Sequence, residues 1–161
     1  MPELQRLRAD HAPAVLAFEL ANRAYFADFI SDRGDEFFGH FDESYNELLA
    51  EQEAGTCIFH VLISADGTVL GLFNLRNLAG GTAELGYRVA QQVAGRGVAT
   101  TTVEEVCQLA AAQYGLRILR AATTYDNVAS QRVLTKAGFV PDGPAQPGGL
   151  PGTWYLRHLA V

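Results

Sequence analysis

The chain has 161 residues, of which 48% are apolar and 19% are charged, and its formal net charge is −6. This length fits a single domain over residues 1–161, and the composition excludes a disordered chain. The acidic balance argues against nucleic acid as the main partner, because binding to phosphate backbones needs clustered Lys and Arg.

The first third of the chain predicts one strand and two helices. Residues 3–9 are typical of a short strand, and apolar residues then recur at helical spacing over residues 10–30. Glycines interrupt residues 28–40, where we expect a loop. A second helix should begin at Asp42, a good N-cap, and end at Gly55.

An antiparallel meander should follow these helices. Residues 56–75 combine two β-branched and aromatic runs around Asp66-Gly67, a dipeptide favoured in tight primed turns. A third run, residues 82–89, comes directly after a pair of glycines. We therefore expect three consecutive antiparallel strands.

The last third of the chain alternates helices and strands. An apolar stripe predicts a helix over residues 98–114, and residues 116–125 predict a strand. The next helix opens at Asp126 or Asn127, and residues 152–161 predict a last strand with a short one before it. The order is β-α-α-β-β-β-α-β-α-β-β, an α/β (α+β) mixed sheet.

Cysteine usage and hydropathy indicate the compartment. Cys57 and Cys107 lie in apolar stretches without metal-ligand spacing, so we expect buried thiols in a reducing environment and no metal site. No window approaches the ~18 apolar residues of a membrane span, and no signal peptide is visible. We therefore expect a cytoplasmic protein away from the membrane.

The stretch VAGRGVATTT, residues 93–102, predicts an anion site where a turn enters a helix. The start of a helix presents unpaired N–H groups, and glycines at 95 and 97 would let a phosphate approach them. A P-loop is excluded by the missing lysine, and a dinucleotide fingerprint lacks its third glycine because Thr100 stands there. A turn that is glycine-rich only for its shape remains the alternative.

The segments AGRGVAT and DNVASQRVLTKAGF together resemble the GNAT N-acetyltransferase superfamily. Gly97 and Ala99 match the last two positions of that family's loop signature, while Ala94 replaces its first Gln or Arg. A second register, through Gln92, Gly95 and Gly97, fits the formula but displaces the helix start. The runs LQRLRADHAPAV and AELGYRV resemble the ribosomal-protein-alanine N-acetyltransferase branch.

The resemblance implies a GNAT-type fold and acetyl-CoA as co-substrate. The pantetheine arm would pair with the main chain of Arg88 and Val89, and Asn127 would contact the same arm. The pyrophosphate would bind to the backbone amides of Gly95, Arg96, Gly97, Val98, Ala99 and Thr100.

Acetyl transfer to an amine needs a base, an oxyanion donor and a proton for the departing thiolate. Glu84 is the expected base, because it shares a strand face with Gly86 and Arg88 near the expected thioester. The family's usual tyrosine acid is replaced by Leu134, and the resemblance implies Ser130 in its place. We expect the N–H group of Val89 to stabilise the oxyanion.

The resulting hypothesis is direct acetyl transfer from acetyl-CoA to a primary amine, on a protein N-terminus or a small molecule. The alternative is an inactive module that senses acyl-CoA. The strand residues His60 and Asn74 could face the acceptor, although a structural role is favoured for His60. The aromatic residues of the N-terminal helices are expected mostly in the core, with a few lining the acceptor pocket. The oligomeric state stays open, with a homodimer among the alternatives.

Overall fold

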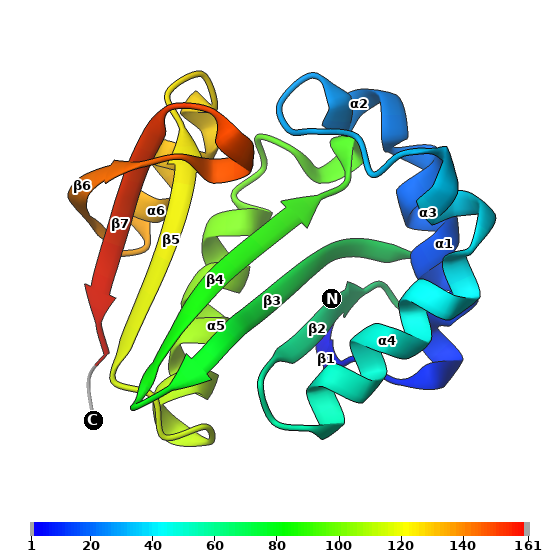
Figure 1. Cartoon of the computed structure of the whole chain (residues 1–161), viewed down its shortest axis with the longest axis horizontal. Helices are drawn as coiled ribbons and strands as arrows, with labels where there is room; N and C mark the ends of the chain where they lie inside the picture. The colour runs from blue at the N-terminus through cyan, green and yellow to red at the C-terminus, as the bar shows by residue number, and fades with distance from the viewer. Residues whose placement is uncertain (1, 160–161) are drawn as a thin grey trace.

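The computed structural model describes residues 2–159, which form a seven-stranded sheet with helices on both faces (Figure 1). The strand order is β1-β2-β3-β4-β5-β7-β6, and only β4 and β5 pair in parallel. The mixed sheet expected from the sequence is confirmed. The strands are β1 (Glu3–Arg6), β2 (Ile58–Ile63), β3 (Val69–Ala79), β4 (Thr82–Val89), β5 (Ile118–Thr124), β6 (Val140–Ala145) and β7 (Gly152–His158).

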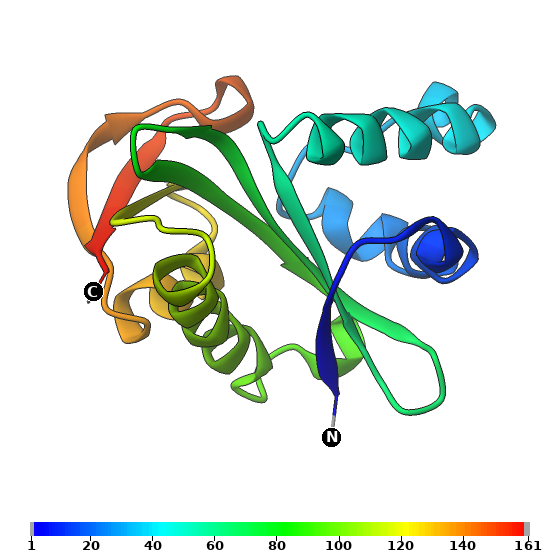
Figure 2. The ribbon, with the colours of Figure 1, turned by 90° about the horizontal axis from the view of Figure 1, so that it is seen from below.

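Two groups of helices cover the two faces of the sheet (Figure 2). On one face lie α1 (Ala12–Ala21), α2 (Arg23–Ala27), α3 (Asp35–Gly39) and α4 (Phe41–Glu53), and on the other lie α5 (Val98–Ala112) and α6 (Val128–Lys136). Each group encloses its own apolar core against the sheet. Short 3₁₀ helices are η1 (Ala9–His11), η2 (Gln91–Val93) and η3 (Pro147–Gly149).

The prediction of one continuous helix over residues 10–30 is wrong, because the helix is interrupted at Asn22, between α1 and α2. The buried Asn22 amide donates to the carbonyl of Phe18 and accepts from the N–H of Gln91. These two bonds tie the break to the loop after β4. The expected loop over residues 28–40 also contains α3.

Two local predictions about turns and caps need correction. The second helix begins one residue before Asp42, and His40 occupies its N-cap position. The hairpin between β2 and β3 is confirmed, but its turn is not primed. The N–H of Gly67 donates to the carbonyl of Ser64, and Gly67 has a φ of 89° while Asp66 has no positive φ. Such a four-residue turn with a left-handed glycine is the next commonest hairpin connection.

The parallel strands β4 and β5 separate soon after they pair. Their register covers only Thr82–Glu84 against Ile118–Arg120, whereas β4 stays paired to β3 as far as Val89. From Leu85 onward, one edge of β4 therefore faces a gap that widens toward the start of α5 (Figure 1). This splay interrupts the sheet at its centre and gives a ligand access to strand main chain.

Candidate active site

The turn before α5 is shaped to receive an anion. Gly95 and Gly97 have φ values of 74° and 78°, in the left-handed region that favours glycine. A Cβ atom at either position would meet no heavy atom within 4 Å, so the space above the turn is open. Gly97 is the N-cap of α5, and the positive end of the helix dipole points at this space.

Six successive amides point out of this turn without a partner. Within residues 2–159, no protein acceptor pairs with the N–H groups of residues 95–100, whereas Ala94 and Thr101 both donate to main-chain carbonyls. These six are the amides that the sequence analysis assigned to a pyrophosphate. A run of free donors at a helix start is the arrangement that binds phosphate groups.

The open edge of β4 presents peptide groups from alternate residues. The N–H of Ala90 donates to the carbonyl of Leu70 at 2.8 Å, which fixes the alternation with β3. The peptide groups of Arg88 therefore point toward β3, while those of Tyr87 and Val89 point into the gap. Of the two residues expected to pair with a pantetheine arm through the main chain, Val89 presents its peptide groups to the gap. The expectation for Arg88 is wrong, because its peptide groups are turned to β3.

Three adjoining cavities lie along the splay and beside it. The central cavity, about 420 Å³, opens between β4 and β5. We call the turn with the six free amides the cradle. The cradle-side cavity, about 140 Å³, leads to Gly95 and Ala99 and shares Tyr87, Asn127 and Ser130 with the central one. The aromatic recess, about 160 Å³, lies under α4 and shares its boundary with the central cavity. A ligand could extend through all three.

One buried hydroxyl in the central cavity lacks a partner. Thr123 on β5 is 4% exposed, and its Oγ1 is the one buried side-chain N or O atom without a hydrogen bond in the described part of the chain. Buried polar groups are nearly always satisfied, so an orphan in a cavity wall suits a polar group of a ligand. The amides of a pantetheine arm would fit this requirement.

Asn127 and Ser130 are placed by the start of α6. The Asn127 side chain accepts from the N–H of Ser130, as an N-cap residue does, so Asn127 rather than Asp126 opens the helix. The Ser130 hydroxyl faces the cavities and lies 2.9 Å from the hydroxyl of Tyr87 on β4. Leu134 is buried and lines the central cavity without a polar group.

Tyr87 was not singled out from the sequence. Its ring stacks on Phe73 at 5.8 Å, and burial raises the pKa of Tyr87 to about 12. The phenol therefore keeps its proton at neutral pH and can donate it. The motif ELGYRV gave the only sequence signal, and that motif does not show which face the tyrosine occupies.

Glu84 lies one residue before the splay, on the face of the sheet that carries α1 to α4. Gly86 follows on the same face, where a Cβ atom would meet nothing within 4 Å. The Glu84 carboxylate accepts from the amide of Asn77 and stands beside Arg76 in the β3–β4 register. Arg76 lines the central cavity, whereas Glu84 is its neighbour and does not line the cavity.

Arg88 is held by a buried carboxylate that the sequence analysis also missed. Glu19 on α1 is 2% exposed and pairs with Arg88, at 3.2 Å, and with Arg33. The guanidinium of Arg88 also lies 4.8 Å from the ring centre of Phe26. Burial lowers the pKa of Arg88, and Glu19 opposes that lowering. This triad connects α1 to the splayed end of β4.

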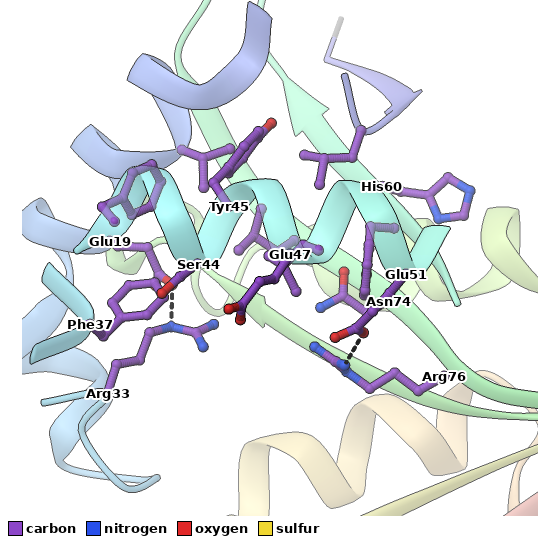
Figure 3. A pocket seen from close by; sticks show the side chains of 16 residues that line it. Glu19, Arg33, Phe37, Ser44, Tyr45, Glu47, Glu51, His60, Asn74 and Arg76 are labelled. Carbon is purple, nitrogen blue, oxygen red and sulfur yellow. Dashed lines mark hydrogen bonds and ion pairs between the residues drawn. The ribbon is translucent and has the colours of Figure 1, made fainter. Parts of the chain in front are cut away.

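The two remaining candidates, His60 and Asn74, have different surroundings. His60 is buried, with Nδ1 donating to the carbonyl of Phe73 and Nε2 accepting from the hydroxyl of Tyr114 at 2.7 Å. His60 borders the aromatic recess, but its ring points away from it (Figure 3). Asn74 lines both the central cavity and the recess.

An anion cradle at a helix start, a free strand edge and a central cavity between two splayed strands together define a transferase that uses an acyl-CoA thioester. The chain belongs to the GNAT acetyltransferase family, since the model of the acetyltransferase (GNAT) domain matches residues 3–140.

Individual relatives agree with this assignment. The chain is 27% identical over 157 residues to the probable N-acetyltransferase YjcK of Bacillus subtilis (strain 168), covering 92% of this chain and 86% of the relative. The ribosomal-protein-S5-alanine acetyltransferase from Vibrio fischeri has the same fold, with a TM-score of 0.89, 17% identity and coverages of 98% and 93%. RimJ of Mycobacterium smegmatis, solved with CoA-disulfide, gives a TM-score of 0.85 at 21% identity, with coverages of 96% and 80%.

Proposed function

We propose that the chain, as one domain, transfers the acetyl group of acetyl-CoA to a primary amine by direct attack in a ternary complex. The observation that carries this proposal is the run of six free amides at residues 95–100, which leads through two adjoining cavities to the splay. The amine would belong to a peptide or protein N-terminus or to a small molecule. The free, buried thiols of Cys57 and Cys107 support a reducing, cytoplasmic setting.

Binding of the co-substrate follows from the main chain. The pyrophosphate would accept hydrogen bonds from the amides of residues 95–100, and the pantetheine arm would extend along β4 beside Tyr87 and Val89. The side chain of Asn127 and the free hydroxyl of Thr123 border the same path. The thioester would then lie in the central cavity next to Gly86.

Glu84 would remove a proton from the incoming ammonium group, directly or through water. The amine lone pair then forms the C–N bond, and the C–S electrons leave with sulfur. The N–H of Val89, which points into the gap, would donate to the carbonyl oxygen as negative charge develops. Glu84 would act along the sheet face that it shares with Gly86, where a Cβ atom would meet no heavy atom within 4 Å.

The departing thiolate would receive its proton from the Tyr87–Ser130 pair. Ser130 borders both the central and cradle-side cavities, and the phenol of Tyr87 hydrogen-bonds to it at 2.9 Å. Tyr87 supplies from β4 the phenol that Leu134 cannot supply from α6. The attacking nitrogen then loses its second proton, which restores the one given up by the Tyr87–Ser130 pair. The products are the acetylated amine, CoA with a free thiol, and the proton taken by Glu84, which is released to solvent.

The direct test incubates the purified protein with acetyl-CoA and a panel of amines and peptides while free thiol is measured. Acetyl-CoA affinity is measured separately by calorimetry. Thiol release that depends on an acceptor supports the proposal. Tight binding without turnover on any acceptor would indicate an acyl-CoA sensor instead, and absence of binding would exclude both.

A further inference from the structure

The aromatic recess is a cavity under α4, on the face of the sheet that carries α1 to α4. Its wall includes a row of aromatic rings at helical spacing, Phe37, Phe41 and Tyr45, with Phe59 of β2 beneath them. Adjacent rings in the row are 5.7 Å and 5.6 Å apart between centroids. Figure 3 shows Phe37 and Tyr45 beside the space that α4 covers. The rings therefore give the recess a continuous aromatic surface beside its polar lining residues.

The recess is continuous with the central cavity. Leu72, Asn74, Arg33 and Arg76 line both spaces. Asn74 is paired in register with Gly86, the open position next to the expected thioester. A molecule with its amine beside Gly86 would thus have the rest of its body directed past Asn74 into the recess.

The size and lining of the recess limit what can occupy it. Its volume of about 160 Å³ is close to the roughly 150 Å³ of an apolar cavity that binds benzene. Aromatic rings favour a further ring packed at an edge or an offset face. A phenyl group or a branched aliphatic chain would fill this space, whereas a methyl group would leave most of it empty.

Polar side chains also line the recess, among them Arg33, Glu47 and Asn74. The carboxylate of Glu47 extends from α4 toward the opening between Arg33 and Arg76 (Figure 3), and it has no ion pair within the described residues. Arg76 pairs with Glu51 at 3.5 Å. The Asn74 amide has no hydrogen-bond partner in the described part of the chain. A cationic amine can pass this opening, while its apolar part belongs inside.

We infer that the acceptor is a primary amine that carries an aromatic or branched aliphatic group, and that the aromatic recess binds this group. The inference rests on the proposed function and names the substrate class for it. The group can belong to a free amine or to the side chain of the first residue of a peptide. Both sources present the same chemistry to Phe41, Tyr45 and Phe59.

The test compares acceptors that differ only in the ring. Phenethylamine is measured against ethylamine, and a peptide that begins with Phe against the same peptide beginning with Ala. For the correct source, the ring-bearing acceptor should have a kcat/KM higher by at least about 10-fold, the effect expected for filling an apolar pocket. Whichever pair shows the preference identifies the source.

Two neighbouring residues of α4 provide matched variants. Leu48 lines the recess, and Leu49 does not. Leu48→Trp should abolish the preference for the ring while ethylamine turnover stays within about 3-fold of wild type; Leu49→Trp should keep the preference. A thermal melt of both variants checks that they fold. Equal kcat/KM for both acceptors in wild type, or equal behaviour of the two variants, would overturn the inference.

A binding titration separates this inference from the proposed function. Phenethylamine is titrated into protein saturated with CoA, where no transfer can occur. Saturable binding that Leu48→Trp removes and Leu49→Trp retains supports the recess even if no acceptor is turned over. Transfer to ethylamine without any binding of phenethylamine would leave the proposed function standing and exclude the recess as an acceptor site.

Discussion

The hydroxyl groups of Tyr87 and Ser130 lie 2.9 Å apart and join β4 to α6 where the central and cradle-side cavities meet. The two residues are 43 positions apart in the chain. Ser130 is held by the N-cap of α6, and Tyr87 is held by stacking on Phe73. The pair thus presents two fixed, coupled hydroxyls at the point where we place the sulfur of the leaving group.

Removing one hydroxyl of this pair should slow the proposed acetyl transfer. We expect Tyr87→Phe to lower kcat by about 10²-fold, within the range for loss of a general acid, with acetyl-CoA affinity nearly unchanged. Steady-state kinetics and calorimetry check both. Because burial raises the pKa of Tyr87 to about 12, the phenol stays protonated below pH 10 and should cause no loss of wild-type rate there.

Tyr125→Phe is the matched control, since Tyr125 is 58% exposed on the loop before α6. It should behave as wild type. A wild-type kcat in Tyr87→Phe would show that the phenol has no part in proton delivery, and Ser130→Ala would then be the remaining test of that step.

Glu84→Gln should lower kcat/KM by about 10²-fold at neutral pH, because a glutamine amide cannot accept the proton of the ammonium group. The deficit should shrink as pH rises, since the amine then loses its proton to solvent. A kcat/KM profile from pH 6.5 to 9.5 measures this. Glu105→Gln, an exposed residue of α5, is the control. A parallel offset at every pH would contradict a base role for Glu84.

The sequence predicted those features of the fold that depend on local chemistry. Gly55, Gly115 and Gly138 all have positive φ at the ends of helices, as their positions indicated. The break at Asn22 could not be predicted, because its hydrogen-bond partner Gln91 lies 69 positions away. A continuous apolar periodicity hides a break that tertiary contacts impose.

In the candidate site, too, local features could be predicted from the sequence and tertiary contacts could not. The cradle is local, so glycine spacing and a helix start predicted an anion site in this turn, and the family resemblance implied the amides of residues 95–100. The Tyr87–Ser130 contact and the carboxylate of Glu19 depend on which face each side chain occupies after folding. The aromatic spacing of Phe37 and Phe41 is compatible with a core and with a pocket wall. The cavity beneath α4, which both residues line, supports the pocket wall.

Gly97→Val should weaken CoA binding at least about 10-fold, because a side chain would occupy the space in front of the six amides. Valine would also be strained in the left-handed backbone conformation of this position. Such a strained residue costs about 1–3 kcal/mol. Gly67→Val is the control for strain alone, since Gly67 also has a positive φ and open space but lies in the β2–β3 turn. Both variants should melt earlier than wild type, and only Gly97→Val should lose affinity. Equal affinities in calorimetry would exclude the cradle.

Thr123→Val should have opposite effects on stability and on binding. The buried hydroxyl has no partner, so its removal should raise the free energy of unfolding by about 1 kcal/mol in the free protein. The same change should weaken CoA binding, because the ligand would lose a hydrogen bond. Thr102→Val is the control: that hydroxyl is also 4% exposed but donates to the carbonyl of Val98. Urea denaturation and calorimetry test both effects, and unchanged CoA affinity in Thr123→Val would contradict the assignment.

His60 should make the protein less stable in mild acid. Burial lowers the pKa of His60 below its ordinary value of 6.5, and the nearby charge of Arg6 acts in the same direction. Between the lowered pKa and 6.5, the unfolded chain binds a proton that the folded chain does not, so the free energy of unfolding falls as pH drops below 6.5. His60→Gln should flatten this slope in urea denaturation between pH 7.5 and 5. A smaller slope should remain, because burial also lowers the pKa of His11. The exposed His40 gives the control His40→Gln, the same substitution outside the core. An unchanged slope in His60→Gln would mean that another group carries the acid sensitivity.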